Sequence, residues 1–99
     1  MTDVVASLSE VRNAIDDLDR QIIARIAERQ QWVVEAGKLK KDEEGVRAPD
    51  RVAQVIGKVR GLAVEAGASP DVVEKAYRAL IAGFVELELE LEIHRARAE

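Results

Sequence analysis

The first half of the chain carries an apolar stripe with helical spacing. Apolar residues recur there at steps of three and four, at Leu8, Val11, Ile15, Leu18, Ile22 and Ile26. This spacing places their side chains on one face of an α-helix. Ser7 and Glu10 have the S-x-x-E pattern of a capping box, which indicates where the helix begins. The pattern predicts a helix over about residues 7–42, followed by a break with Gly45 as its flexible point.

Two further helices follow, because the breaks between them have recognisable helix ends. Pro49 suits the first turn of a helix over about residues 49–66. Gly67 and Ser69 are typical of a helix C-terminus and of the N-cap of a third helix, over about residues 70–96. Residues 85–93 alternate like a strand, but Leu and Glu are strong helix formers and the sequence offers no second strand. We predict an all-α fold of three helices in one domain, residues 1–99.

The length of the first predicted helix bears on assembly. A rod of about 35 residues is about 50 Å long, too long for a compact small monomer. At 99 residues the chain is also near the lower end of what can bury a self-sufficient core. We therefore expect a partner chain.

Composition and charge exclude several classes of function. The net charge of −4 argues against general binding to nucleic acids or anionic membranes. The chain has no cysteine, and its one histidine, His94, does not make a metal site, so we expect no metal and no cofactor. Residues 1–6 lack a basic start and a long apolar run, which predicts an unexported, cytoplasmic protein.

The apolar stripe ends in two cations. Continued in the same steps, it reaches Arg29 and then Lys40. A buried cation needs an anion, which is either a protein carboxylate or a ligand. The two positions are about 16 Å apart along a helix, which leaves room for a small dianion between long side chains. Alternatively, both side chains extend to solvent or pair with glutamates.

One carboxylate of the third helix falls on its apolar face. Projected at helical spacing, Glu88 lies within the arc of Tyr77, Leu80, Ile81 and Phe84, whereas Glu86 and Glu90 point away. Glu88 either forms a salt bridge to Arg29 or Lys40, or stays protonated through burial and donates a hydrogen bond.

Three more arginines are candidates for anion binding. Arg47 and Arg51 flank the start of the second helix, whose free N–H groups favour anions. Arg12 precedes Arg29 by about 25 Å along the same helix and cannot reach the same small ligand. It is either a surface charge or serves the pocket of a second chain whose first helix runs antiparallel.

Together these charges resemble a known family. The set is Arg12, Arg29, Lys40, Arg47, Asp50, Arg51 and Glu88, in the frames Ala27–Arg29, Glu35–Lys40 and Val46–Arg51. It resembles the all-helical chorismate mutases, over about Leu8 to Leu91. The resemblance implies an intertwined, domain-swapped-like homodimer with two active sites, each borrowing an arginine from the partner's long helix.

The resemblance also implies roles for individual residues. Arg29 and the partner's Arg12 would bind the two carboxylates of a chorismate-like dianion. Lys40 would contact one carboxylate and the ether oxygen, to which Glu88 would donate a hydrogen bond. The implied reaction is the cofactor-free [3,3] rearrangement of chorismate to prephenate, in which negative charge develops on the ether oxygen.

Three positions depart from the commonest pattern of the family. Ala48 and Val52 replace acidic residues that contact the ring hydroxyl in many mutases, and Phe84 replaces a small polar residue found in some. The frame around Ala48 resembles the branch with isochorismate-pyruvate lyases, which form salicylate and pyruvate. The open alternatives are this lyase activity, a 4-amino-4-deoxychorismate mutase and, in a different class, a non-catalytic helical dimerisation module.

Overall fold

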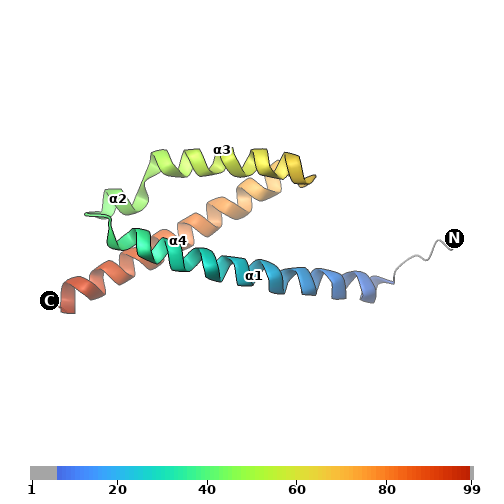
Figure 1. The fold of residues 1–99 in the computed structure, drawn as a ribbon, viewed down its shortest axis with the longest axis horizontal. Helices are drawn as coiled ribbons and strands as arrows, with labels where there is room; N and C mark the ends of the chain where they lie inside the picture. Colours follow the sequence, from blue (N-terminus) through green and yellow to red (C-terminus); the bar gives the residue numbers. More distant parts are fainter. Residues whose placement is uncertain (1–6, 99) are drawn as a thin grey trace. The chain divides into compact units, whose positions relative to one another are not determined.

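The chain is all-helical over the residues that the structure describes. This computed structural model describes the backbone of residues 7–98 and the side chains of residues 7–92. Its helices are α1 (Leu8–Lys38), α2 (Glu43–Arg47), α3 (Pro49–Ala66) and α4 (Pro70–Ala98), with no strand in this range (Figure 1). The strand-like alternation of residues 85–93 lies within α4. Residues 1–6 and the side chain of His94, on which two expectations depend, lie outside the described residues.

The chain divides after Trp32 into two compact units. In the first unit, the Ser7 hydroxyl accepts the N–H of Glu10 at 3.2 Å, so the predicted cap of α1 is confirmed. The prediction that the apolar stripe is buried does not hold within one chain: five of its six side chains are exposed, from 43% at Val11 to 62% at Leu8, and Ile26 is half-buried. A lone helix face has nothing to pack against, so this stripe needs a cover from outside the unit.

The second unit begins at Val33 and contains a small core. α3 and α4 are joined at residues 67–69 and pack on each other, while α2 packs on α4 (Figure 1). The buried apolar residues are Val46, Ile56, Val59, Ala63 and Phe84. Those of α3 recur at steps of three and four, because one helical face supplies them all.

The turn between α3 and α4 has the predicted chemistry. Gly67 has φ 79°, a left-handed conformation that glycine adopts without strain. The Ala68 N–H donates to the carbonyl of Ala63 at 2.8 Å. The Ser69 hydroxyl accepts the N–H of Val72 at 3.3 Å, which confirms it as the N-cap.

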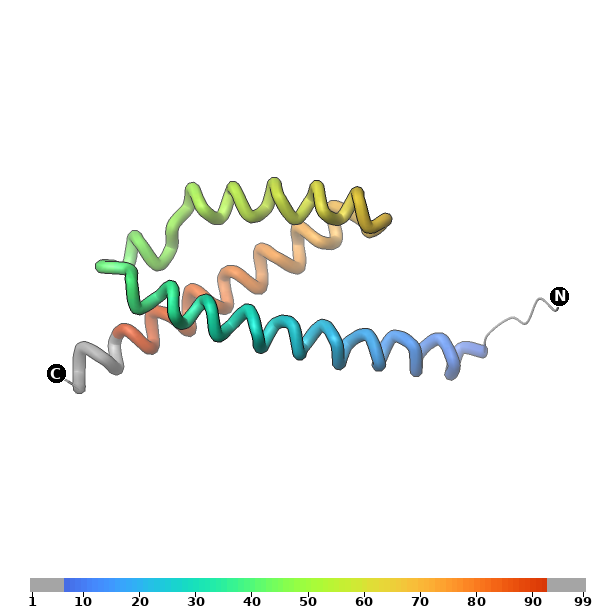
Figure 2. The backbone as a smooth tube through the Cα atoms, in the orientation of Figure 1, coloured from blue at the N-terminus to red at the C-terminus, as the bar shows by residue number. Residues whose placement is uncertain are grey.

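The end of α1 differs from the prediction. α1 ends at Lys38 rather than near residue 42, because the N–H groups of Leu39 and Lys40 bond to carbonyls three residues back and tighten the last turn. The Asp42 carboxylate then accepts the Gly45 N–H at 2.8 Å and caps α2. Gly45, predicted as the flexible point of a break, thus lies inside a short helix. Figure 2 shows this short helical segment between α1 and α3 along the chain.

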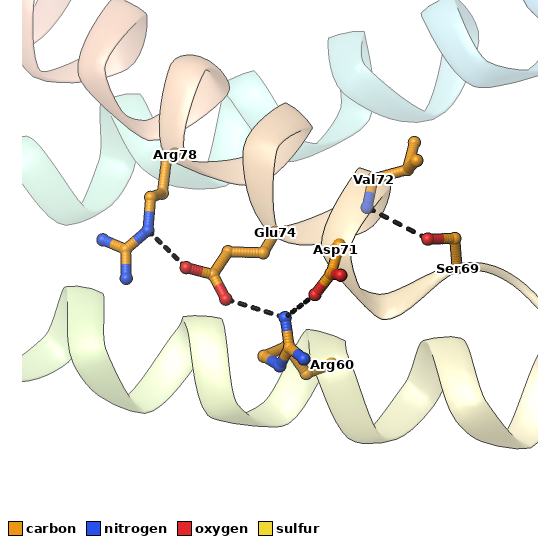
Figure 3. A network of polar contacts seen from close by, with 6 residues as sticks. All are labelled: Arg60, Ser69, Asp71, Val72, Glu74 and Arg78. Atoms are coloured by element: carbon orange, nitrogen blue, oxygen red, sulfur yellow. Dashed lines mark hydrogen bonds and ion pairs between the residues drawn. The ribbon is translucent and has the colours of Figure 1, made fainter.

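An ion-pair network links α3 to α4. Arg60 of α3 donates to Asp71 at 3.0 Å and to Glu74 at 2.9 Å, and Arg78 donates to the other oxygen of Glu74 at 2.8 Å (Figure 3). The hydrogen bond from Arg78, followed by that from Arg60, lowers the pKa of Glu74, although burial opposes this shift. The hydrogen bonds to Asp71 and Glu74 raise the pKa of Arg60. Sequence patterning did not single out this network, because its interhelical bonds join Arg60 to residues 11 and 14 positions later, across the break between α3 and α4.

This network predicts a pH-dependent stability. The pKa of Glu74 is lowered from 4.5 on folding, so its contribution is fully present above pH 4.5 and is lost as the pH falls further. The urea midpoint of unfolding should therefore fall less between neutral and acidic pH in Glu74→Gln than in wild type. Glu65→Gln, at an exposed position of α3, is the control and should follow wild type. Equal acid sensitivity of Glu74→Gln and wild type would contradict the prediction.

Candidate functional site

The structure brings Lys40 and Glu88 together. Lys40 lies in the turn after α1, and its Nζ is 3.0 Å from Oε2 and 3.4 Å from Oε1 of Glu88. The Glu88 side chain is 6% exposed and that of Lys40 is 26% exposed. The stripe prediction placed Lys40 on α1 itself, and this is corrected: α1 ends two residues earlier, and the long side chain reaches α4 from the turn.

The inward direction of Glu88 was predicted from helical spacing and is confirmed. Glu88 and Phe84 are both buried, one turn apart on α4. Glu86 and Glu90 are exposed, on the other side of the helix. Of the two interpretations of Glu88, the geometry matches the salt bridge to Lys40. The single ammonium of Lys40 neutralises the buried carboxylate of Glu88. A second anion bound beside them would add a negative charge that this ammonium does not neutralise.

Gly37 completes this part of the site, although sequence reasoning gave it no role. It is buried in the last turn of α1, and a Cβ atom built on it would lie 3.4 Å from Oε2 of Glu88. The available signal was a residue without a side chain three positions before Lys40.

The second group of candidate residues surrounds the junction of α2 and α3. Arg47, the last residue of α2, binds the Glu43 carboxylate at 2.8 Å. Arg51, in the first turn of α3, donates to Oε1 of Gln54 at 2.5 Å. Both arginine side chains are exposed and are held by neighbours on their own helices. An incoming anion would have to compete with Glu43 for Arg47.

Ala48 has an unusual backbone conformation at this junction. It has φ 39° and ψ 64°, in the left-handed region, and it ends α2 and precedes α3. Its N–H donates to Glu44 at 2.8 Å, and its carbonyl accepts the N–H of Val52 at 3.0 Å. A left-handed alanine costs roughly 1–2 kcal/mol, which the two helix ends must offset. Ala48 and Val52 are both half-buried, so they present apolar surface beside the two arginines.

Arg12 and Arg29 belong to the first unit, on α1. Arg12 is exposed, and Arg29 is half-buried. They are 17 positions apart along one continuous helix, which corresponds to about 25 Å of rise. This separation fits the expectation that they do not hold the same small ligand from the same chain.

Two searches of the described residues bear on other classes of site. No group of three or more His, Cys, Asp or Glu side chains among them could hold a metal ion. None of the helices has a described stretch long and apolar enough to cross a membrane.

Comparison with known proteins decides the family. The model of the family described as chorismate mutase type II matches residues 11–89, most of the chain. The chain belongs to the chorismate mutase type II family. It is also 30% identical over 78 residues to the isochorismate pyruvate lyase of Pseudomonas aeruginosa, covering 79% of this chain and 77% of that protein. Every candidate residue named above lies within the segment that matches the chorismate mutase model.

Proposed function

We propose that this protein is a chorismate mutase that converts chorismate to prephenate without a cofactor. The observation that carries the proposal is the pair of half-buried Lys40 and buried Glu88, 3.0 Å apart, in a chain of the chorismate mutase type II family. An ammonium and a carboxyl group on one buried site supply what the reaction needs at the ether oxygen. Arg29, Arg47 and Arg51 are proposed to hold the substrate carboxylates together with Arg12.

The chemistry requires orientation and charge stabilisation. In the rearrangement the C–O bond of the enolpyruvyl ether breaks as a C–C bond to the ring forms, so no atom is gained or lost. Negative charge builds on the ether oxygen as the C–O bond lengthens. The Lys40 ammonium and a hydrogen bond from Glu88 would stabilise that charge more in the transition state than in the substrate.

The donor role of Glu88 requires a proton. In the structure Glu88 accepts a hydrogen bond from Lys40. A substrate carboxylate that binds the same ammonium competes with Glu88 for it, and two negative groups in one pocket favour protonation of one of them. Binding of the dianion would thereby convert Glu88 from an acceptor into a donor.

This role predicts a pH-dependent activity. Because only the protonated Glu88 can donate, activity should fall as the pH rises between about pH 5 and 8. Glu88→Gln, whose amide donates at every pH, should keep its activity at the upper end of that range. The measurement is kcat/KM as a function of pH for both proteins. A flat profile for wild type would argue against the donor role.

The direct test is turnover of two substrates. Purified protein is incubated separately with chorismate and with isochorismate, and prephenate, salicylate and pyruvate are followed. Prephenate from chorismate supports the proposal. Salicylate and pyruvate from isochorismate, without prephenate, would replace it by the lyase activity. Turnover of neither would leave a non-catalytic dimerisation module as the better description.

The lyase activity is the second candidate because specific residues favour it. Ala48 and Val52 are apolar and half-buried where many mutases are expected to have acidic residues toward the ring hydroxyl. The 30% identical relative from Pseudomonas aeruginosa is described as an isochorismate pyruvate lyase. The arginines proposed to bind the substrate carboxylates, and Lys40 and Glu88 at the ether oxygen, would serve both reactions. A 4-amino-4-deoxychorismate substrate would use the same residues.

We further propose that the active form is a homodimer. The apolar stripe on the part of α1 that belongs to the first unit supports this, because a single chain leaves most of its side chains exposed to water. A two-fold dimer with antiparallel long helices would cover the stripe and bring Arg12 to the site of the other chain.

A further inference from the structure

Gly37 lies directly against the side chain of Glu88. A Cβ atom at this position would be 3.4 Å from Oε2, 3.6 Å from Cγ and 3.7 Å from Cδ of Glu88. The carboxyl group therefore rests beside the backbone of α1, at the distance that a methyl group would just fill. Position 37 has no room for a larger side chain unless Glu88 moves.

The same glycine shapes the path of Lys40. The carbonyl of Gly37 accepts the N–H of Lys40 at 3.2 Å, in the turn that ends α1. From this turn Lys40 Nζ reaches Oε2 of Glu88 at 3.0 Å. One residue thus adjoins both members of the pair, through its carbonyl on one side and its missing side chain on the other.

We propose that Gly37 is a positioning residue for the Lys40–Glu88 pair, holding the Glu88 carboxyl group where it can face both Lys40 and the ether oxygen of the substrate. The inference rests on the proposed function for the substrate half of this statement. On the other packed elements, Glu43, Glu44 and Arg47 of α2 are exposed, and Arg60 of α3 pairs with Asp71 and Glu74, which lie 14 or more positions before Glu88 on α4. Lys40 donates a hydrogen bond to Glu88.

Two substitutions at position 37 have different expected effects. In Gly37→Ala the methyl group comes into van der Waals contact with the carboxyl group, and the added apolar group beside it disfavours the ionised form. The high-pH limb of the activity profile should therefore move to higher pH. In Gly37→Val the bulkier side chain pushes Glu88 from its place, and kcat should fall about 10- to 100-fold with a smaller change in KM.

Gly61 supplies a matched control. It lies inside α3, and a Cβ atom built there would meet no atom within 4 Å. Gly61→Ala and Gly61→Val make the same change in helix propensity without touching the site. Both should keep the pH profile and kcat of wild type, whatever they do to thermal stability.

The decisive measurement is kcat and KM against pH for the four variants, with Gly37→Ala repeated in Glu88→Gln. The proposal requires the upward shift in Gly37→Ala, its disappearance in the Glu88→Gln background and the loss of kcat in Gly37→Val. A Gly37→Ala profile that superimposes on that of wild type would overturn it, and this comparison decides alone if Gly37→Val does not fold.

A readout without substrate separates this inference from the proposed function. Carbon-13 NMR follows the titration of the Glu88 carboxyl group directly, with Glu88→Gln identifying its signal. Gly37→Ala should raise the pH at the midpoint of that titration, and Gly61→Ala should leave it in place. If wild type is inactive but the midpoint is shifted in Gly37→Ala, the proposed function is wrong and the positioning role is supported. If the midpoint in Gly37→Ala is unshifted, the positioning role is wrong.

Discussion

Lys40→Ala is expected to lower kcat/KM by about a thousandfold on the substrate that the wild type converts, because one ammonium is asked to stabilise both a carboxylate and the developing charge on the ether oxygen. The loss should appear mainly in kcat, since an interaction that strengthens in the transition state affects the chemical step. Steady-state kinetics on chorismate and on isochorismate measure it.

Lys38→Ala is the matched control for this variant. Lys38 is two positions away, is 54% exposed and pairs with Glu35 at 2.9 Å on the surface of α1. An exposed pair of this kind contributes little, so Lys38→Ala should stay within about twofold of wild type. Comparable losses in the two variants would mean that general positive charge, and not the position of Lys40, is responsible. Less than a tenfold loss in Lys40→Ala would remove this residue from the chemistry.

The two later helices illustrate what a sequence can predict about this fold. The bounds of α3 were predicted as they are found, because Pro49 and Gly67 have strong conformational preferences. Helical spacing also predicted that Glu88 points inward, since the period of a helix fixes which residues share a face. Local chemistry is sufficient for predictions of this kind.

The end of α1 shows why the rest could not be predicted. Residues 39–41 contain no glycine or proline, so the local sequence gives no reason to stop the helix at Lys38. The helix ends because Asp42 caps a new one and Val46 of that new helix is buried. This choice depends on packing within the second unit, which a local pattern does not contain.

The apolar stripe shows a second limit, which concerns the partner. Spacing predicted correctly that Leu8 through Ile26 share a face of one helix, but amphipathicity does not specify what covers that face. Within one chain the stripe stays largely exposed. The candidate site was predicted in the same incomplete way: helical spacing left Arg29 and Lys40 open as partners of Glu88, which the structure pairs with Lys40. The proposed role of Arg12 depends on a second chain.

Mixing two inactive variants should restore activity if Arg12 acts in trans. Arg12→Ala and Arg29→Ala are each expected to lose about a hundredfold or more in kcat/KM, because each removes an arginine proposed to bind one carboxylate of the substrate. In a mixed dimer, one site combines the intact Arg29 of the first variant with the intact Arg12 of the second. Random reassociation of equal amounts should therefore return about a quarter of wild-type activity, from one good site in half of the dimers.

Other pairings of variants determine which residues belong to the same half of the site. Arg12→Ala mixed with Lys40→Ala should also recover activity, because Lys40 is proposed to serve the same chain's site as Arg29. Arg29→Ala mixed with Lys40→Ala should not recover, since both defects then lie in the half supplied by one chain and every mixed dimer has two damaged sites. If Arg12 served its own chain, none of these mixtures would recover activity, because each mixed dimer would have one defect in each site. Recovery in the first two mixtures and none in the third can be explained only by an arginine that crosses between chains.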